Sequence, residues 1–275
     1  MLIEKQIVAI ALDPHRIIDR FERLRYRGLR LRRGLAKTAL LSFGRPAPKP
    51  FMVLCRARSG SNFLLSLFEG HPNTLIYGEK LRHYREGHSE RFLDHLAGRR
   101  AWWVRAVGFK MFYDHPHNVE APALWQRLVT DQALAIVHLR RRNLLHVLLS
   151  QTLAERSDHW VERTDQRHRE DSAIQSVEIE PGWLESQFRL IEDQQQEFGR
   201  RFGSHPMIEI DYEALVERRQ QEFDRICRLL ELPSAPARAH TRRQRRRPAS
   251  ELISNYESLR KHFRDSRWAE FFSAS

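Results

Sequence analysis

The chain has 275 residues, 41% of them apolar, which suffices for one buried core and does not require a second domain. Its 47 lysines and arginines against 35 acidic residues give a net charge of +12. The expected partners are therefore polyanions such as nucleic acids, anionic lipids, acidic glycans or phosphorylated cofactors. Two cysteines exclude a disulfide framework and a cysteine-based zinc site, and no apolar stretch reaches the roughly 18 residues of a membrane span.

Residues 1–45 form a basic segment that we expect to be a helical N-terminal extension. Ile17, Phe21 and Leu24 recur at helical spacing while arginines fill the other faces, and a proline-rich break at 44–50 ends the segment. The extension either packs on the domain with a solvated arginine face or lies on an anionic membrane. Because no cleavage pattern follows the short apolar run at its start, we expect a cytoplasmic protein, peripheral to the inner membrane surface if this helix binds lipid.

Residues 50–275 show the pattern of one α/β domain. Short apolar runs alternate with amphipathic segments, as in a parallel sheet that helices cover on both faces. The predicted strands are 51–55, 74–77, 104–112, 133–139 and 207–210. The predicted helices are 62–69, 143–156, 183–202 and 213–231, and a long surface loop is expected over 155–182. We therefore expect a three-layer, P-loop-like sandwich with a central parallel sheet.

The first strand runs into a glycine turn and a helix begins at once, in Val53-Leu-Cys-Arg-Ala-Arg-Ser-Gly-Ser-Asn-Phe63. The backbone N–H groups of such a turn point into one concavity, and the helix N-terminus adds its positive dipole end. Arg58 supplies fixed charge, and Ser59 and Ser61 supply hydroxyl groups. A Walker A loop would carry a lysine after its second glycine, and here an asparagine and a phenylalanine follow instead. The segment therefore predicts a phosphate or sulfate site for a nucleotide whose transfer needs no metal.

A second basic motif follows the fourth predicted strand, in Ile136-Val-His-Leu-Arg-Arg-Arg-Asn-Leu-Leu-His-Val-Leu-Leu-Ser150. A strand ends in three arginines, and a serine lies in the next helix eight residues after Arg142. Arginine offers forked donors to phosphate oxygens, and the serine hydroxyl can complete the shell. By itself an arginine triplet at a strand end is also typical of a solvated turn. Together with the first loop it indicates a second phosphate site.

These motifs resemble the PAPS-dependent sulfotransferases, whose phosphosulfate loop has a basic residue, Ser-Gly-Thr/Ser-Thr and then an aromatic or aliphatic residue. Arg58-Ser-Gly-Ser-Asn-Phe63 matches except that Asn62 replaces the usual threonine. Glu69-Gly-His-Pro-Asn73 with Tyr77-Gly-Glu79, and Ile210-Asp-Tyr-Glu-Ala-Leu215, resemble the bacterial carbohydrate branch, which includes nodulation and trehalose-sulfating enzymes. The resemblance extends over roughly residues 50 to 272. It implies that 3′-phosphoadenylyl sulfate (PAPS) is the donor, that adenosine 3′,5′-bisphosphate (PAP) is the product, and that no metal takes part.

The resemblance also implies roles for single residues. Arg58 would hold the transferring group, Phe63 would stack on adenine and Tyr212 would touch it. Lys110 either approaches the sulfuryl oxygens or extends its stem along a strand edge. The cofactor-binding residues that the resemblance implies are Arg58, Ser59, Gly60, Ser61, Asn62, Phe63, Arg142, Ser150, Tyr212 and Arg243.

The transfer also needs a base for the acceptor hydroxyl. Cytosolic members of the family use a histidine two residues after a strand lysine, but Phe112 stands at that distance from Lys110. In the bacterial branch the proposed base is a glutamate just after the second strand, and Glu79 has that place. His115 is the rival candidate. His71, in the turn Gly70-His-Pro72, is expected to cap or pack at a helix end.

The acceptor and two other classes of function remain open from the sequence. The resemblance implies a carbohydrate or glycolipid acceptor. A non-catalytic basic nucleic-acid-binding protein would also explain the arginine clusters, although no RNP, KH or zinc-finger pattern is present. A P-loop kinase would need the missing lysine and a magnesium-binding carboxylate. The aromatic side chains open to either sugar stacking or core packing are His83, Tyr84, Trp102, Trp103, Trp125 and Trp160.

Overall fold

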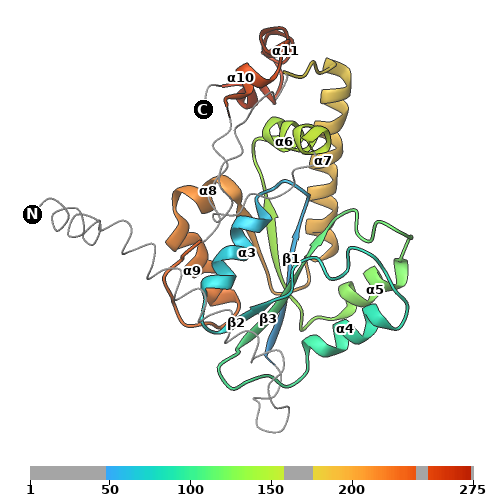
Figure 1. Cartoon of the computed structure of the whole chain (residues 1–275), viewed down its shortest axis with the longest axis vertical. Helices are drawn as coiled ribbons and strands as arrows, with labels where there is room; N and C mark the ends of the chain where they lie inside the picture. Colours follow the sequence, from blue (N-terminus) through green and yellow to red (C-terminus); the bar gives the residue numbers. More distant parts are fainter. Residues whose placement is uncertain (1–47, 158–175, 240–246, 274–275) are drawn as a thin grey trace, which may run out of the picture.

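The computed structural model describes residues 48–157, 176–239 and 247–273 (Figure 1). The strands are β1 (Lys49–Cys55), β2 (Thr74–Ile76), β3 (Ala106–Phe112), β4 (Ala135–Arg140) and β5 (Met207–Asp211). The helices are α3 (Ser61–Gly70), α4 (His88–Leu96), α5 (Pro122–Thr130), α6 (Leu144–Ser157), α7 (Pro181–Arg201), α8 (Tyr212–Glu217), α9 (Arg219–Leu229), α10 (Ala249–Leu252), α11 (Tyr256–His262) and the 3₁₀ helix η1 (Ala269–Phe272). The expected extension at 1–45, Trp160 and Arg243 lie outside the described residues.

The five strands form one parallel sheet in the order β2-β3-β1-β4-β5. Each of the five lies where the apolar runs predicted a strand, so the expected α/β class with a central parallel sheet is confirmed. In a parallel sheet all carboxyl ends meet at one edge, and the loops that follow β1, β2, β3 and β4 therefore share that edge.

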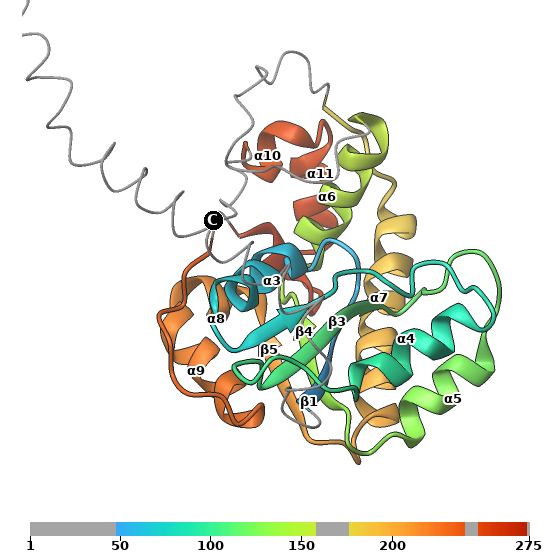
Figure 2. The ribbon, with the colours of Figure 1, turned by 60° about the horizontal axis from the view of Figure 1, so that its bottom comes forward.

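Helices cover both faces of the sheet, which makes the domain three layers thick (Figure 2). Met52 and Leu54 of β1 pack in the cluster that includes side chains of α4, α5 and α7. Phe51 and Val53 point the other way and pack with α3, α8 and α9. All four side chains are fully buried, because a central parallel strand alternates its side chains between two covered faces.

A separate apolar cluster joins α6 and α7 to the C-terminal helices α10, α11 and η1, which lie beyond one end of the sheet (Figure 1). Phe188 of α7 contacts the aromatic rings of Phe263, Trp268 and Phe271. Among the residues that the structure describes, no helix combines the length and the apolar character needed to cross a bilayer.

Two expectations about the chain's organisation are corrected. The helix predicted over 213–231 is two helices, α8 and α9, because Arg218 between them has the non-helical angles φ −117° and ψ 47°. The surface loop predicted over 155–182 is wrong at its C-terminal end. Val177 and Ile179 are buried, and Val177 donates its backbone N–H to Leu252.

Candidate active site

The predicted phosphate loop is the turn between β1 and α3, and its backbone makes room for only one residue type at position 60. Gly60 has φ +90°, and a Cβ atom there would lie 2.1 Å from Cδ2 of Tyr212. Both facts require glycine. Helix α3 begins directly after it with no side-chain cap, so its first backbone N–H groups remain available to an anion.

Arg58 and Ser150 come together across the site although they are 92 positions apart. Nε of Arg58 donates to Oγ of Ser150 at 2.8 Å, and the serine is buried in α6. Burial, and then the nearby charge of Arg141, lower the pKa of the Arg58 guanidinium, which nonetheless stays a cation at neutral pH. The structure therefore brings one residue of each predicted phosphate motif into direct contact.

In the arginine triplet at the end of β4, the residue that faces the phosphate loop is not the one that the spacing predicted. Arg141 is 17% exposed, donates from Nη1 to the backbone oxygen of Arg58 at 3.1 Å, and lies over the ring of Tyr212. Arg142, the residue chosen from the spacing, is 63% exposed. Glu213 of α8 accepts from the backbone N–H of Arg142 at 3.1 Å and so ties α8 to the turn before α6. Sequence reasoning missed Arg141, because the spacing alone does not show which arginine turns toward the loop.

Two aromatic rings stand beside the loop at the place assigned to adenine. Phe63 and Tyr212 meet edge to face with centroids 6.3 Å apart. The guanidinium of Arg219, at the start of α9, lies 5.3 Å from the Phe63 centroid. The rings therefore form a partly exposed apolar corner with cationic neighbours.

Lys110 is the centre of the site. Its side chain is 3% exposed, and Nζ contacts Glu79 Oε1 at 2.8 Å, Asn62 Oδ1 at 2.9 Å and Ser61 Oγ at 3.3 Å. An ammonium has three N–H donors, so these contacts use all of them. The alternative of a lysine with its charge in solvent at a strand edge is therefore wrong. Asn62, where the resemblance leads one to expect threonine, supplies one of the three acceptors.

Glu79 follows β2 after a turn at Gly78, and Lys110 donates its own backbone N–H to that turn. Burial by itself would raise the pKa of Glu79, but the charge and the hydrogen bond of Lys110 outweigh it and hold the pKa below the usual 4.5. The carboxylate is thus ionised at neutral pH, and its side chain is 30% exposed. It is a carboxylate fixed by a buried cation and still open to an incoming hydroxyl.

His115 lies next to Glu79, with Nε2 4.0 Å from Oε2 of the carboxylate. Its Nδ1 accepts the backbone N–H of Phe112 at 3.2 Å, so in the neutral ring the proton is on Nε2. Burial, and then His117, lower the pKa of His115 to about 4. A neutral imidazole with its one lone pair already used cannot take a proton from an acceptor, and this excludes His115 as the base in this arrangement.

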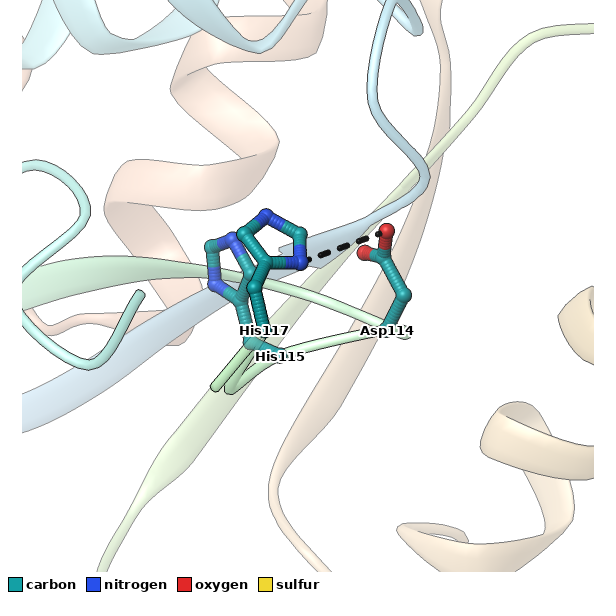
Figure 3. Close-up of side chains that lie close together, drawn as sticks. All are labelled: Asp114, His115 and His117. Carbon is teal, nitrogen blue, oxygen red and sulfur yellow. Dashed lines mark ion pairs between the residues drawn. The ribbon is translucent and has the colours of Figure 1, made fainter. Parts of the chain in front are cut away.

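Asp114, His115 and His117 lie close together (Figure 3), with candidate ligand atoms within 4.8 Å of one another. In the figure His117 faces Asp114, at 3.8 Å from Nδ1 to Oδ2. Zinc ligands would be about 3.3 Å apart at usual Zn–N distances. The Nδ1 atom of His115 accepts from a backbone N–H and its Nε2 carries the proton, so it offers no lone pair to an ion. This group therefore does not fit a metal in the geometry observed.

Two residues singled out from the sequence, His71 and Trp125, have structural roles. His71 donates from Nε2 to the backbone oxygen of Pro233 and accepts from the N–H of Asn73 at Nδ1, which confirms the expected packing role. Trp125 is buried, and its indole donates to the backbone oxygen of His115 at 3.0 Å. It therefore belongs to the core, and its ring is not available for stacking on a sugar.

Sequence comparison decides the family. The Stf0 sulphotransferase family model matches residues 114–258, more than half of the chain. The chain belongs to the Stf0 sulphotransferase family. Nodulation protein H of Rhizobium tropici is 29% identical over 241 residues, which cover 82% of this chain and 94% of the relative. Nodulation protein H of Rhizobium meliloti is also 29% identical, over 245 residues, covering 82% and 95%.

Among solved structures, a sulfotransferase from Alicyclobacillus acidocaldarius aligns with a TM-score of 0.48 and 17% identity, over 80% of this chain and 91% of that one. Membership of the Stf0 family makes this chain an enzyme that transfers a sulfuryl group, and so confirms the predicted function over a basic binding protein. The family match starts at Asp114. The assignment of the phosphate loop and of Glu79 therefore rests on geometry and on the motif resemblance.

Proposed function

We propose that this Stf0 sulfotransferase takes its sulfuryl group from PAPS and transfers it to a hydroxyl of a carbohydrate or glycolipid, with Glu79 as the base. The observation that carries the proposal is the position of Lys110. Its one buried ammonium is bonded both to the loop, through Ser61 and Asn62, and to Glu79. The base and the anion site therefore lie within one hydrogen-bonded unit.

The residues present fit the donor. The turn at Gly60 lies so close to the ring of Tyr212 that no Cβ atom fits between them, and the uncapped start of α3 offers N–H groups to the 5′-phosphate. Phe63 and Tyr212 provide an apolar corner for adenine. When bound, PAPS supplies an activated sulfuryl group on a phosphate leaving group. Arg58 and Lys110 then place fixed positive charge where negative charge grows.

A second group of residues supports a site for the 3′-phosphate. Ser150 accepts from Arg58, and in the part of the chain that the structure describes no acceptor is bonded to its own O–H, which can therefore donate to a ligand. Arg142 is exposed at the start of α6 and can turn toward a ligand, whereas Arg141 already faces the loop. Arg243, which the resemblance also implies, stays a proposal because it lies outside the described residues.

The protein groups divide the proton transfer between them. Glu79 is ionised at neutral pH and accepts the hydroxyl proton at Oε2, while Lys110 keeps Oε1 in place. Because the loop and the carboxylate share one lysine, an acceptor hydroxyl at Glu79 is held close to the anion in the loop. Positioning and electrostatic stabilisation then account for most of the expected acceleration.

The donor site predicts that PAP binds without magnesium and that the Arg142→Ala variant binds it about 10- to 100-fold more weakly, the effect of a lost hydrogen bond to a charged group. Calorimetric titration measures both dissociation constants. The matched control is Arg260→Ala on α11, because Arg142 is 63% exposed and Arg260 is 61% exposed. Absence of PAP binding by the folded wild-type protein would contradict the donor assignment.

The acceptor proposal is supported by the similarity to two nodulation proteins H and by the resemblance to carbohydrate-sulfating enzymes. We expect transfer of radiolabelled sulfuryl from PAPS to trehalose, to an N-acetylglucosamine oligosaccharide, or to a glycolipid in phosphatidylglycerol vesicles. Stimulation by the vesicles that is lost on removal of residues 1–45 would support peripheral membrane contact by the extension. Transfer to a small phenol alone, unaffected by vesicles, would contradict the carbohydrate class.

A further inference from the structure

The imidazole of His115 is held in a single orientation. Its backbone N–H donates to Phe112 at 3.1 Å, its backbone oxygen accepts from the indole of Trp125 at 3.0 Å, and Nδ1 accepts from the N–H of Phe112. The ring also contacts the rings of Phe112 and His117, with centroids 4.8 and 4.6 Å away. Both the tautomer and the direction of the Nε2–H are therefore set by the fold.

The Nε2–H points to no acceptor at hydrogen-bond distance. The atom is buried, and among the described residues it has no hydrogen-bond partner. Leaving such a donor unpaired costs about 1–3 kcal/mol, so native structures rarely keep one without a reason. The carboxylate oxygen within reach is Oε2 of Glu79 at 4.0 Å. A closure of about 1 Å would bring the two atoms to the usual N–H···O length.

Three other roles are excluded by the same contacts. His115 is not the base, because its lone pair is used at Nδ1. It is not a metal ligand for the same reason. It does not bind the acceptor directly, because Nε2 is buried away from any incoming oxygen. What remains is an action through Glu79.

We propose that His115 is the positioning residue for Glu79, donating its Nε2–H to Oε2 in the working complex while Lys110 holds Oε1. The inference rests on the proposed function, in which Glu79 is the base. Hydrogen bonds in active sites are often long without substrate and tighten when it binds, which accounts for the 4.0 Å separation. With both oxygens held, one lone pair of Oε2 stays directed at the acceptor hydroxyl.

A neutral donor suits this place better than a second cation. Lys110 already lowers the pKa of Glu79, and another positive charge would weaken the base further. The charged or titratable groups that face Glu79 are Lys110, His115 and Arg82. Those that face His115 are His117, Asp114, Glu79 and Lys110. Burial keeps the imidazole neutral over the working pH range, so it orients the carboxylate without cancelling its basicity.

The test compares His115→Phe, which removes the donor, with His115→Gln, whose amide can place an N–H near the Nε2 position. The control is His88→Gln, a change at an exposed histidine at the start of α4. Hydrolysis of PAPS, measured as PAP release across pH, makes water the acceptor and avoids dependence on the carbohydrate. We expect His115→Phe to lower the rate about 10- to 100-fold and to move the acidic limb to higher pH, because the ionised carboxylate loses a donor. His115→Gln should recover much of the rate, and His88→Gln should leave it unchanged.

Two further readouts separate this role from a structural one. PAP affinity by calorimetry should be the same in all variants, and imidazole NMR of the wild-type protein should show the Nε2–H tautomer for His115. An Nδ1–H tautomer, or a His115→Phe variant with an unmoved acidic limb, would overturn the proposal. Failure of the wild-type protein to bind PAP would instead overturn the proposed function, and with it the role of His115.

Discussion

The Glu79→Gln variant is expected to lose about 10²- to 10⁴-fold in the rate of sulfuryl transfer, the contribution of a positioned base. Glutamine keeps the shape of the side chain and an oxygen for the 2.8 Å contact with Lys110, but it cannot take a proton. PAP binding should be unchanged, because Glu79 lies across Lys110 from the loop. Initial rates with PAPS and calorimetry with PAP measure the two effects separately.

The matched control for this prediction is Glu86→Gln, an exposed carboxylate a few residues further along the same segment. It should transfer at the wild-type rate. A Glu79→Gln variant with near wild-type turnover would place the base elsewhere. Loss of PAP affinity together with turnover would mean that the substitution disturbs the whole site and not the proton transfer alone.

The strands could be predicted because parallel strands buried on both faces are continuous apolar runs, as Phe51-Met-Val-Leu-Cys55 shows. Helices α4 and α5 escaped prediction because each has nine residues and a short apolar pattern. The break at Arg218 escaped as well, because both sides of it have helix-forming residues and no glycine or proline marks the turn. Tertiary contacts determine where these helices form and end, and in such cases local helix propensity is a weak guide.

Those candidate-site residues could be predicted whose position in space follows from their place in the order of strands. The loop at Gly60 and Glu79 each follow a strand, Lys110 lies near the end of β3, and the carboxyl ends of parallel strands share one edge. Contacts that depend on side-chain direction were not predictable. The tautomer of His115 is fixed by a single hydrogen bond from a backbone N–H to its Nδ1. The side chain of Arg141 points toward the loop because of the backbone direction at the end of β4.

The Lys110→Met variant should lose about 10²- to 10³-fold in transfer rate, the cost of removing a preorganised positive group from the site. Methionine fills similar space but bonds to none of the three partners, which leaves Ser61 and Asn62 without the cation that orients them. The Lys80→Met variant, an exposed lysine beside Glu79, is the matched control and should retain the wild-type rate.

The Lys110→Met variant should also reverse the direction in which the contribution of Glu79 to folding stability changes with pH. In the wild-type protein the pKa of Glu79 is lowered, so its ionisation stabilises the fold at neutral pH and this contribution disappears as the pH falls through the folded pKa. Without Lys110, burial becomes the dominant influence and raises the pKa above that of the unfolded chain. Protonated Glu79 then favours the folded state at acidic pH, and this stabilisation disappears as the pH rises through the folded pKa.

Denaturant unfolding across the acidic range measures this difference directly. The stability of Lys110→Met relative to the wild-type protein should fall as the pH rises from the acidic range toward neutrality. The double variant Lys110→Met/Glu79→Gln should show a smaller fall, because it lacks the wild-type contribution of ionised Glu79 but has no buried carboxylate without its lysine. Lys110 and Glu79 are in contact at 2.8 Å, so their substitutions should not act independently. The sum of the stability losses of Lys110→Met and Glu79→Gln should therefore exceed the loss of the double variant. Additive losses with a flat pH difference would show that the lysine and the glutamate do not act as a pair.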